Sequence, residues 1–185
     1  MNKIILIGCF LVTQFMMGQV SHITKNILSY TKDVFPYQGT RIISIDEVHS
    51  PDKEENVYIF SKIEANKQPD SLYFQHYKNK SGNWKKIKSI SFSHDGFLSI
   101  WKSRKAFMDS DKNKSIDALF IFSKHNKDKE QESVHLLLCS NEELYFISAK
   151  KEDNYQEFTY SDNFKNLKES IKSDVIKYWN ELDKK

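Results

Sequence analysis

The sequence predicts a β-rich α+β fold: two duplicated β-meander units in one sheet system or sandwich, with a C-terminal amphipathic helix packed on it. Three observations lead to this prediction. Short runs of β-branched and aromatic residues alternate with polar stretches along most of the chain, and one of these runs recurs later in the chain. The C-terminal end instead carries apolar residues at three- and four-residue spacing, which is the helical period.

The first unit reads as a series of strands separated by polar segments. The expected strands cover residues 41–45, 57–60, 71–77 and 84–92. A polar loop over 46–56 contains Pro51, and residues 79–83 form a turn. Before Pro36, residues 21–34 fit either a short helix or an irregular lead-in, so this segment stays open.

The second unit repeats the first at a constant offset of 62 positions. Residues 57–62, Val-Tyr-Ile-Phe-Ser-Lys, match residues 119–124, Leu-Phe-Ile-Phe-Ser-Lys. The same offset, without a gap, aligns 72–74 with 134–136, Asn79 with Asn141, and Trp84 with Phe146. The repeat units therefore cover approximately 41–92 and 107–148. Because a unit of about three strands has a face that it cannot bury alone, we expect the two units to pack together.

Residues 162–183 are expected to form a helix, with Ser161 or Asp162 as the N-cap. Its apolar stripe consists of Phe164, Leu167, Ile171, Val175, Tyr178 and Leu182. Such a helix most often covers the open face of a sheet. Its lysines and Trp179 also fit a helix that lies on a membrane surface or on a partner protein, but core packing is the commoner reason for such a stripe.

The composition is that of a globular protein. Of the 185 residues, 39% are hydrophobic and 14% are aromatic, which predicts one β-rich domain over residues 20–185. The 28 Lys and Arg residues nearly balance the 25 Asp and Glu residues, and the net charge of +3 is spread along the chain. This distribution argues against a nucleic-acid partner.

Residues 1–19 have the pattern of a signal peptide. A short basic start precedes the apolar residues 4–12, and we expect cleavage after Gly18 or Gln19. This apolar stretch is too short to span a bilayer, which takes about 20 residues, and no later stretch is longer. The sequence thus predicts an exported protein of the periplasm or cell surface, without a membrane span.

Two cysteines allow different interpretations of the exported chain. Residues 6–9, Leu-Ile-Gly-Cys, resemble a lipoprotein box, which would make Cys9 a lipid anchor, but the apolar stretch before Cys9 is short for such a signal. If the signal peptide is removed near Gly18, Cys139 is the remaining thiol. Its apolar surroundings predict a buried and inert side chain.

The loop over residues 109–117 is the strongest candidate for a binding site. Four oxygen-bearing side chains occupy its positions one, three, five and nine: Asp109, Asp111, Asn113 and Asp117. With the Ser115 carbonyl at position seven, this spacing resembles a calcium loop, so these four are the candidate metal ligands and calcium the candidate cofactor. Lys114 stands where the turn favours Gly, and position twelve is not Glu, which favours a hairpin loop stabilised by its own Asp and Asn side chains.

The sequence shows no local signature of an enzyme. Gly-x-Ser-x-Gly and Cys-x-x-Cys motifs, a glycine-rich phosphate loop and zinc-type histidine spacing are absent from it. For glycoside hydrolysis, the candidates are carboxylates at strand ends, namely Asp46, Glu47 and Asp109. The aromatic residues that would stack on sugars if exposed, and that more often fill a sheet core, are Tyr58, Tyr73, Tyr77, Trp84 and Trp101. We therefore assign no catalytic residue and favour a protein that is not an enzyme.

Residues 107–148 resemble a segment of small exported bacterial proteins linked to surface polysaccharide biosynthesis. In that family a loop of the form Asp-x-Asp-x-Asp-Gly, similar to the loops of FG-GAP type repeats, leads into a strand. A hydrophilic link, a strand like 134–139 and a Tyr-containing strand like 144–146 follow. Trp179 also fits the pattern, whereas Lys114 departs from it because the family has Gly there.

The resemblance implies an exported cell-envelope protein that contributes to surface polysaccharide biosynthesis without catalysing a step. The alternative is a secreted binding module, for a glycan or a protein, with a degenerate calcium site in the loop. A glycan-processing enzyme is the third and least supported interpretation. The expected partners are a cell-envelope glycan or protein, and the sequence does not give the oligomeric state.

Overall fold

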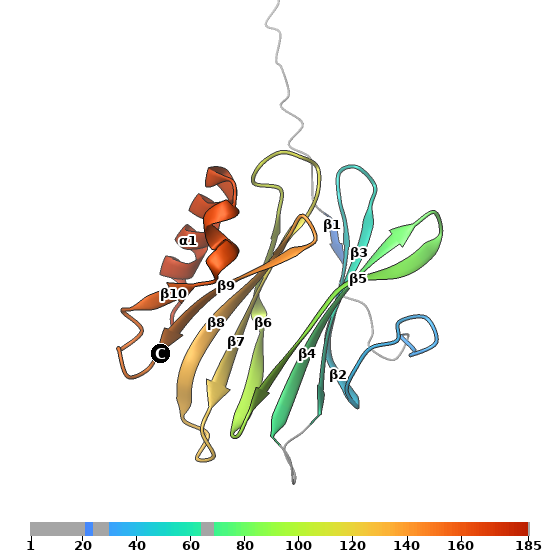
Figure 1. Ribbon diagram of the computed structural model, residues 1–185. Helices are drawn as coiled ribbons and strands as arrows, with labels where there is room; N and C mark the ends of the chain where they lie inside the picture. The colour runs from blue at the N-terminus through green and yellow to red at the C-terminus, as the bar shows by residue number, and fades with distance from the viewer. Residues whose placement is uncertain (1–20, 24–29, 64–68, 185) are drawn as a thin grey trace, which may run out of the picture.

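The computed structural model describes residues 21–23, 30–63 and 69–184 and shows two antiparallel sheets packed face to face, with an α-helix on the outer side of the second sheet (Figure 1). The first sheet contains β1 (Ser21–Ile23), β2 (Arg41–His49), β3 (Glu55–Ile63), β4 (Asp70–Lys80) and β5 (Asn83–His94). The second contains β6 (Phe97–Met108), β7 (Asp117–His125), β8 (Gln131–Ser140), β9 (Glu143–Lys150) and β10 (Phe158–Tyr160). Strand order follows chain order in both sheets, so each sheet is a meander and the predicted fold class is confirmed. The predicted signal peptide and Cys9 lie outside the described residues.

The strands are longer and more numerous than the sequence indicated. The sequence pattern did not predict β6, whose alternation is interrupted by a bulge in which residues 101–104 stand opposite Ile121 alone. It also placed Asp46 and Glu47 in a loop, whereas both lie in β2 and are buried. Their burial is compensated, because Asp46 pairs with Lys105 and the carboxylate of Glu47 accepts a hydrogen bond from the Tyr30 hydroxyl.

The repeat at 62 positions holds for one strand pair and shifts in the next. Adding 62 to the residue numbers of β3 gives 117–125, which are the bounds of β7. The aligned residues Phe60 and Phe122 both point into the core between the two sheets. In β4, however, Phe74 faces the other sheet, while its aligned partner Leu136 in β8 faces the helix. Because successive side chains of a strand point to opposite faces, the gapless alignment is out by one residue from β4 onward.

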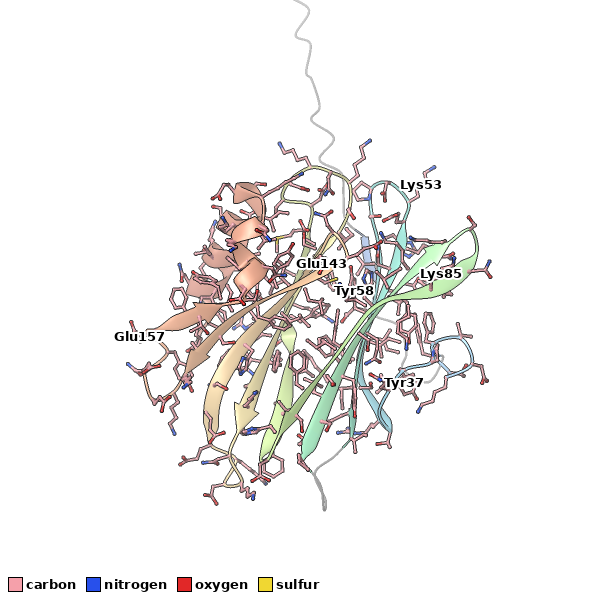
Figure 2. The ribbon with its side chains drawn as sticks, viewed as in Figure 1. Tyr37, Lys53, Tyr58, Lys85, Glu143 and Glu157 are labelled. Carbon is pink, nitrogen blue, oxygen red and sulfur yellow. The ribbon has the colours of Figure 1, made fainter. Side chains whose placement is uncertain are left out.

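The space between the sheets is filled mainly by apolar side chains. The buried residues there are Val48, Tyr58, Phe60, Leu72 and Phe74 from the first sheet, and Leu98, Ile116, Ala118, Phe120, Phe122, Leu137 and Cys139 from the second sheet and the loop before β7. Figure 2 shows Tyr58 between the sheets, whereas Lys53 and Lys85 lie at the periphery. Tyr58 and Phe120 pack with their ring centroids 5.5 Å apart, so aromatic contacts join the two sheets directly.

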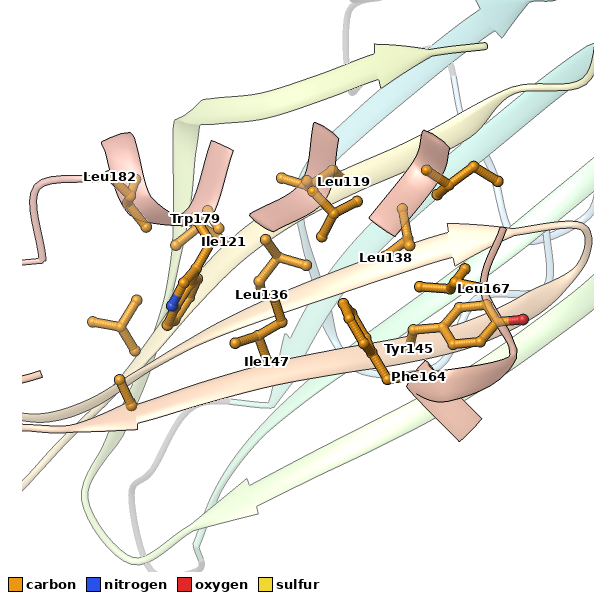
Figure 3. Close-up of a cluster of buried hydrophobic side chains, with 14 residues drawn as sticks. Leu119, Ile121, Leu136, Leu138, Tyr145, Ile147, Phe164, Leu167, Trp179 and Leu182 are labelled. Atoms are coloured by element: carbon orange, nitrogen blue, oxygen red, sulfur yellow. The ribbon is translucent and has the colours of Figure 1, made fainter. Parts of the chain in front are cut away.

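The outer face of each sheet has its own cover. On the first sheet, Tyr30 and Phe35 of the irregular segment before β2 pack on strand residues such as Ile59 and Tyr77. On the second sheet, the C-terminal segment buries Phe164, Leu167, Ile171, Val175, Trp179 and Leu182 against strands β7, β8 and β9 (Figure 3). The prediction that an apolar stripe packs on the sheet is therefore confirmed, except that the fully buried Trp179 takes the place expected for Tyr178, which is half-buried.

The predicted helix over 162–183 is interrupted. It consists of a 3₁₀ turn, η2 (Asp162–Asn166), and the helix α1 (Glu169–Glu181), with Leu167 and Lys168 extended between them. No Pro or Gly marks the break. Tertiary hydrogen bonds hold the first piece in place, since the Asn163 side chain donates to the Leu144 carbonyl at 3.0 Å. Within the described residues no helix has the length and apolar character needed to cross a membrane.

Buried ion pairs connect β6 to the first sheet. Lys62 Nζ lies 2.7 Å from Asp70 Oδ2 and donates to the Leu98 carbonyl of β6 at 2.9 Å. The Leu98 N–H donates to the same Asp70 oxygen at 2.6 Å. Further along β6, Lys105 pairs with the fully buried Asp46. Each of these charges has an oppositely charged partner, as burial requires, and the pairs fix the position of β6 on the first sheet.

Candidate functional site

The predicted metal-binding loop joins β6 to β7 and lies where three parts of the chain meet. The Asn113 side-chain amide donates to Asn141 Oδ1 of the β8–β9 turn at 3.2 Å. Lys168, the residue before α1, places its Nζ 2.7 Å from Asp111 Oδ2. The Asp111 carboxylate is almost completely buried, at 2% exposure. The loop is thus tied to both the second sheet and the C-terminal helix.

Most polar side chains of the loop also bond to the loop backbone. Asp109 Oδ2 accepts the Lys114 N–H at 3.0 Å, and Asn113 Oδ1 accepts the Ser115 N–H at 2.7 Å. Asp111 Oδ1 accepts the Asn113 N–H at 3.3 Å. Lys114 has a φ of 70°, in the left-handed region that favours glycine. These bonds are those of a turn stabilised by its own Asp and Asn side chains.

Three buried oxygens of the loop nevertheless have no hydrogen-bond partner: Asp109 Oδ1, Ser110 Oγ and Asp117 Oδ2. The Asp117 carboxyl faces the loop, because it accepts a hydrogen bond from the Ser110 backbone. Burial raises the pKa of Asp117 to about 6, and the nearby charges of Asp111 and Asp109 add to this rise. The Ser140 hydroxyl and the Ser110 backbone act in the opposite direction. Because burial is the largest cause, the raised pKa shows a carboxyl withdrawn from water.

The four predicted ligands are brought together only in part. The Asn113 amide donates to Asp111 Oδ2 at 3.0 Å, while the Lys168 ammonium occupies the same oxygen. In the part of the chain that the structure describes, no group of three His, Cys, Asp or Glu side chains is arranged to hold a metal ion. Calcium takes six to eight oxygens, so its binding would require Asp111 to exchange Lys168 for the ion. The metal site stays a prediction.

A second candidate is an open polar groove of about 870 Å³ on the second sheet. Residues of β7, β8, β9 and β10 and of the connections beside them line it, including Glu157, which Figure 2 labels near β10. Its walls offer the ammonium groups of Lys124 and Lys150 and the hydroxyl of Ser148, whereas the Phe158 ring packs on the helix side of the sheet, with its centroid 6.3 Å from that of Trp179. Sequence reasoning missed this groove, since its residues belong to separate strands and follow no common spacing.

His135 in the groove has the geometry of a catalytic base but not its chemistry. Its Nε2 lies 2.8 Å from Ser133 Oγ and its Nδ1 lies 2.7 Å from Ser148 Oγ. A hydroxyl beside an imidazole is how a nucleophile and its base are arranged, but an acidic third group normally stabilises the imidazolium. Here the third group is a neutral hydroxyl. Burial, followed by the charges of Lys124 and His94, lowers the pKa of His135 to about 4. The ring therefore positions two serine hydroxyls and is a weak base.

Cys139, His76 and Asn56 form a similar chain inside the sandwich. Cys139 Sγ lies 3.6 Å from His76 Nδ1, and His76 Nε2 lies 2.9 Å from Asn56 Oδ1. All three residues are buried. Burial raises the pKa of the Cys139 thiol to about 12 and, with the Lys78 charge, lowers that of His76 to about 3. A nucleophilic cysteine must be a thiolate, so this chain is a neutral core network, as the prediction of an inert thiol requires.

The other candidates from the sequence have structural roles. The Asp46 and Glu47 carboxylates, considered for glycoside hydrolysis, are both buried and bonded to neighbouring side chains. Tyr58 and Tyr77 belong to the core and offer no exposed ring to a sugar, while the remaining aromatic candidates are half-buried, namely Tyr73, Trp84 and Trp101. The Trp101 ring N–H is bonded to Ser123 Oγ at 2.9 Å.

Fold and sites together define an antiparallel two-sheet protein with a helix on one face, an acidic loop at one corner and a polar groove on one sheet. Comparisons of the chain with protein-family models, with curated proteins and with solved structures find no match.

Proposed function

We propose that the protein is an exported, non-enzymatic component of the cell envelope that binds a polysaccharide in the groove of the second sheet. The observation that carries this proposal is the lining of the groove, which combines hydroxyl, amide, carboxylate and ammonium groups. Sugar hydroxyls both donate and accept hydrogen bonds, so they match such a mixed lining. The resemblance of residues 107–148 supports a role in surface polysaccharide biosynthesis.

The groups in the groove favour binding over catalysis. His135, with its pKa of about 4, is protonated only at a steep cost near neutral pH, and neither of its serine partners is a carboxylate. In contrast, two serine hydroxyls held at 2.7 and 2.8 Å from one ring are fixed in position, which lowers the entropy cost of binding a ligand to them.

The test is titration calorimetry of the exported protein with surface polysaccharide extracted from its source cells. Two changes in the groove, Ser148→Ala and Glu157→Gln, should together weaken binding about 10-fold or more, since a hydrogen bond to a charged group contributes roughly 1.5–3 kcal/mol. Glu181→Gln, on the exposed side of α1 and away from the groove, is the matched control and should bind normally. Failure to bind, or equal binding by the double variant, would refute the proposal.

A cation site in the 109–117 loop is a second candidate, favoured by the three buried oxygens without partners. Calcium should raise the melting temperature of the protein relative to chelator, because a ligand that binds only the folded state stabilises it. Asp117→Asn should abolish this rise. Lys168→Gln should enlarge it, since the lysine competes for Asp111.

The control for this calcium test is Asp95→Asn, an exposed carboxylate that pairs with Lys127 elsewhere on the surface. Its calcium response should equal that of the wild type. If calcium changes the melting temperature of neither the wild type nor Lys168→Gln, the loop is only a turn.

A further inference from the structure

We propose that the end of the β4–β5 hairpin is a docking surface for an anionic phospholipid bilayer, which the protein contacts without inserting into it. Residues 78–88 contain five lysines and no acidic residue. Anionic lipid headgroups attract local basic segments of this kind. None of these residues lines the groove of the second sheet, so this proposal does not depend on the proposed function.

Two of the five lysines are neutralised by carboxylates at the base of the hairpin. Lys78 Nζ lies 2.7 Å from Glu54 Oε2 and 3.3 Å from Glu142 Oε1. Lys88 Nζ lies 3.0 Å from Glu143 Oε1. These pairs join the hairpin to the β2–β3 loop and to the β8–β9 turn, so neither charge is left for a partner.

The other three lysines, Lys80, Lys85 and Lys86, are exposed at the end of the hairpin. In the part of the chain that the structure describes, no carboxylate forms an ion pair with any of them. They lie within four residues of Gly82 in the turn, where an added Cβ would meet no atom within 4 Å. Figure 1 shows this end of the hairpin twisting away from the rest of the first sheet, and Figure 2 shows Lys85 at the periphery. The three charges therefore lie together on a projecting end.

Contacts on the outer face of the first sheet hold this end of the hairpin in place. Trp84 is half-buried, and its ring centroid lies 5.1 Å from that of Phe35. Asn79, which pairs with Trp84 in the ladder, donates from Nδ2 to Glu55 Oε2 at 2.6 Å. Trp84 is the one apolar residue among residues 79–86, and its ring is used in this packing. The hairpin thus has no free apolar side chain to insert into a bilayer, and its attraction to lipid is electrostatic.

The distribution of the three charges fits a flat partner. Successive residues of a strand point to opposite faces, so Lys85 and Lys86 lie on different faces of the hairpin. A small anion on one face would meet only part of this charge, and small ligands bind in concave sites, which a projecting end does not offer. A bilayer that contacts the end of the hairpin attracts all three lysines, since charges act over a Debye length of about 8 Å at physiological ionic strength.

The experiment measures cosedimentation of the exported protein with vesicles made of equal parts phosphatidylglycerol and phosphatidylcholine. The wild type should bind these vesicles in low salt, should not bind phosphatidylcholine alone, and should be released by high salt, which screens exposed charges. The triple variant Lys80→Gln/Lys85→Gln/Lys86→Gln should bind about 100-fold more weakly, since each lysine near an anionic surface strengthens binding about fivefold.

The matched control is Lys102→Gln/Lys165→Gln/Lys177→Gln, which removes the same charge from exposed positions of β6, η2 and α1. It should bind the anionic vesicles like the wild type. Thermal melts verify that both triple variants are folded.

Loss of vesicle binding in the hairpin variant alone supports the docking surface. Equal loss in both triple variants shows a general effect of net charge and overturns it, as does a wild-type protein that stays in the supernatant. Titration with oligogalacturonate tests a soluble polyanion: if only the hairpin variant loses binding to it, and the vesicles are not bound, the partner is an acidic glycan and lipid docking is refuted. Failure of the groove to bind polysaccharide would overturn only the proposed function.

Discussion

At the scale of single residues, the two histidines His76 and His135 are held in neutral form. His76 stacks on Tyr58 at 4.6 Å between ring centroids, and its two nitrogens face Cys139 and Asn56. His135 stacks on Phe122 and bonds two serines. Neither ring has a carboxylate partner that would stabilise its charged form, so burial dominates both pKa values.

These two histidines predict a loss of stability in acid. A histidine in the unfolded chain takes up its proton near pH 6.5, whereas folded His135 does so near 4 and folded His76 near 3. Their contribution to stability is therefore complete above pH 6.5 and is lost as pH falls toward these lower values. Each histidine should add about 1.4 kcal/mol per pH unit to the slope of the free energy of unfolding over most of this range.

Urea unfolding between pH 7 and pH 4 measures the slope. In the variant His135→Gln, the free energy of unfolding should change less steeply with pH, by about 1.4 kcal/mol per pH unit, because glutamine does not titrate. Asp117 acts in the opposite direction, since its raised pKa favours the folded state as pH falls toward 4. It is present in both proteins and cancels in the comparison. Identical slopes for the variant and the wild type would contradict the neutral state of His135 in the folded protein.

At the scale of elements, the strands and the helix could be predicted from the sequence where their apolar residues follow a regular pattern. Residues 57–60 and the stripe from Phe164 to Leu182 have such a pattern, and both are buried as expected. The bulge in β6 breaks the alternation, so this strand carries no clear period. The break at Leu167 and Lys168 has no local signal either, since bonds from distant residues determine it.

The candidate sites were predictable only where they are local in sequence. The spacing of Asp109, Asp111 and Asn113 is visible within one loop, and the structure confirms that these residues lie in one loop. Lys168, which competes for Asp111, comes from another part of the chain. The groove and the Cys139 network likewise draw on several strands, and strand pairing cannot be derived from local spacing.

At the scale of the whole molecule, the relative position of the two sheets depends on polar contacts as well as on the aromatic core. Apolar packing is tolerant of small shifts, whereas an ion pair requires one arrangement. On one side of the sandwich Lys105 of β6 pairs with Asp46 of β2, and the Lys62–Asp70 pair of the first sheet hydrogen-bonds to the Leu98 backbone of β6. On the other side, Lys88 of β5 pairs with Glu143 of β9 at 3.0 Å.

Removing one partner of a buried pair should be costly. Lys105→Met leaves the Asp46 carboxylate buried without its ammonium partner, and we expect a loss of about 3–5 kcal/mol in the free energy of unfolding. The double variant Lys105→Met/Asp46→Leu should recover part of this loss, because the uncompensated charge is gone. Lys102→Met, an exposed position on the same strand, is the control. Urea denaturation measures the free energy of unfolding of the wild type and of the three variants. A Lys105→Met protein as stable as the wild type would contradict the role of the Lys105–Asp46 pair in stability.

The order of the strands also bears on how quickly the protein reaches its native state. Within each sheet every strand pairs with its neighbour along the chain, and apart from the β1–β2 pair each of these hairpins closes over a short length of backbone. Folding rates rise as contacting residues come closer in sequence, because less chain entropy is lost before a contact forms. Each sheet can therefore assemble by itself, and the docking of β6 onto the first sheet, through residues far apart in sequence, becomes the slower and later event.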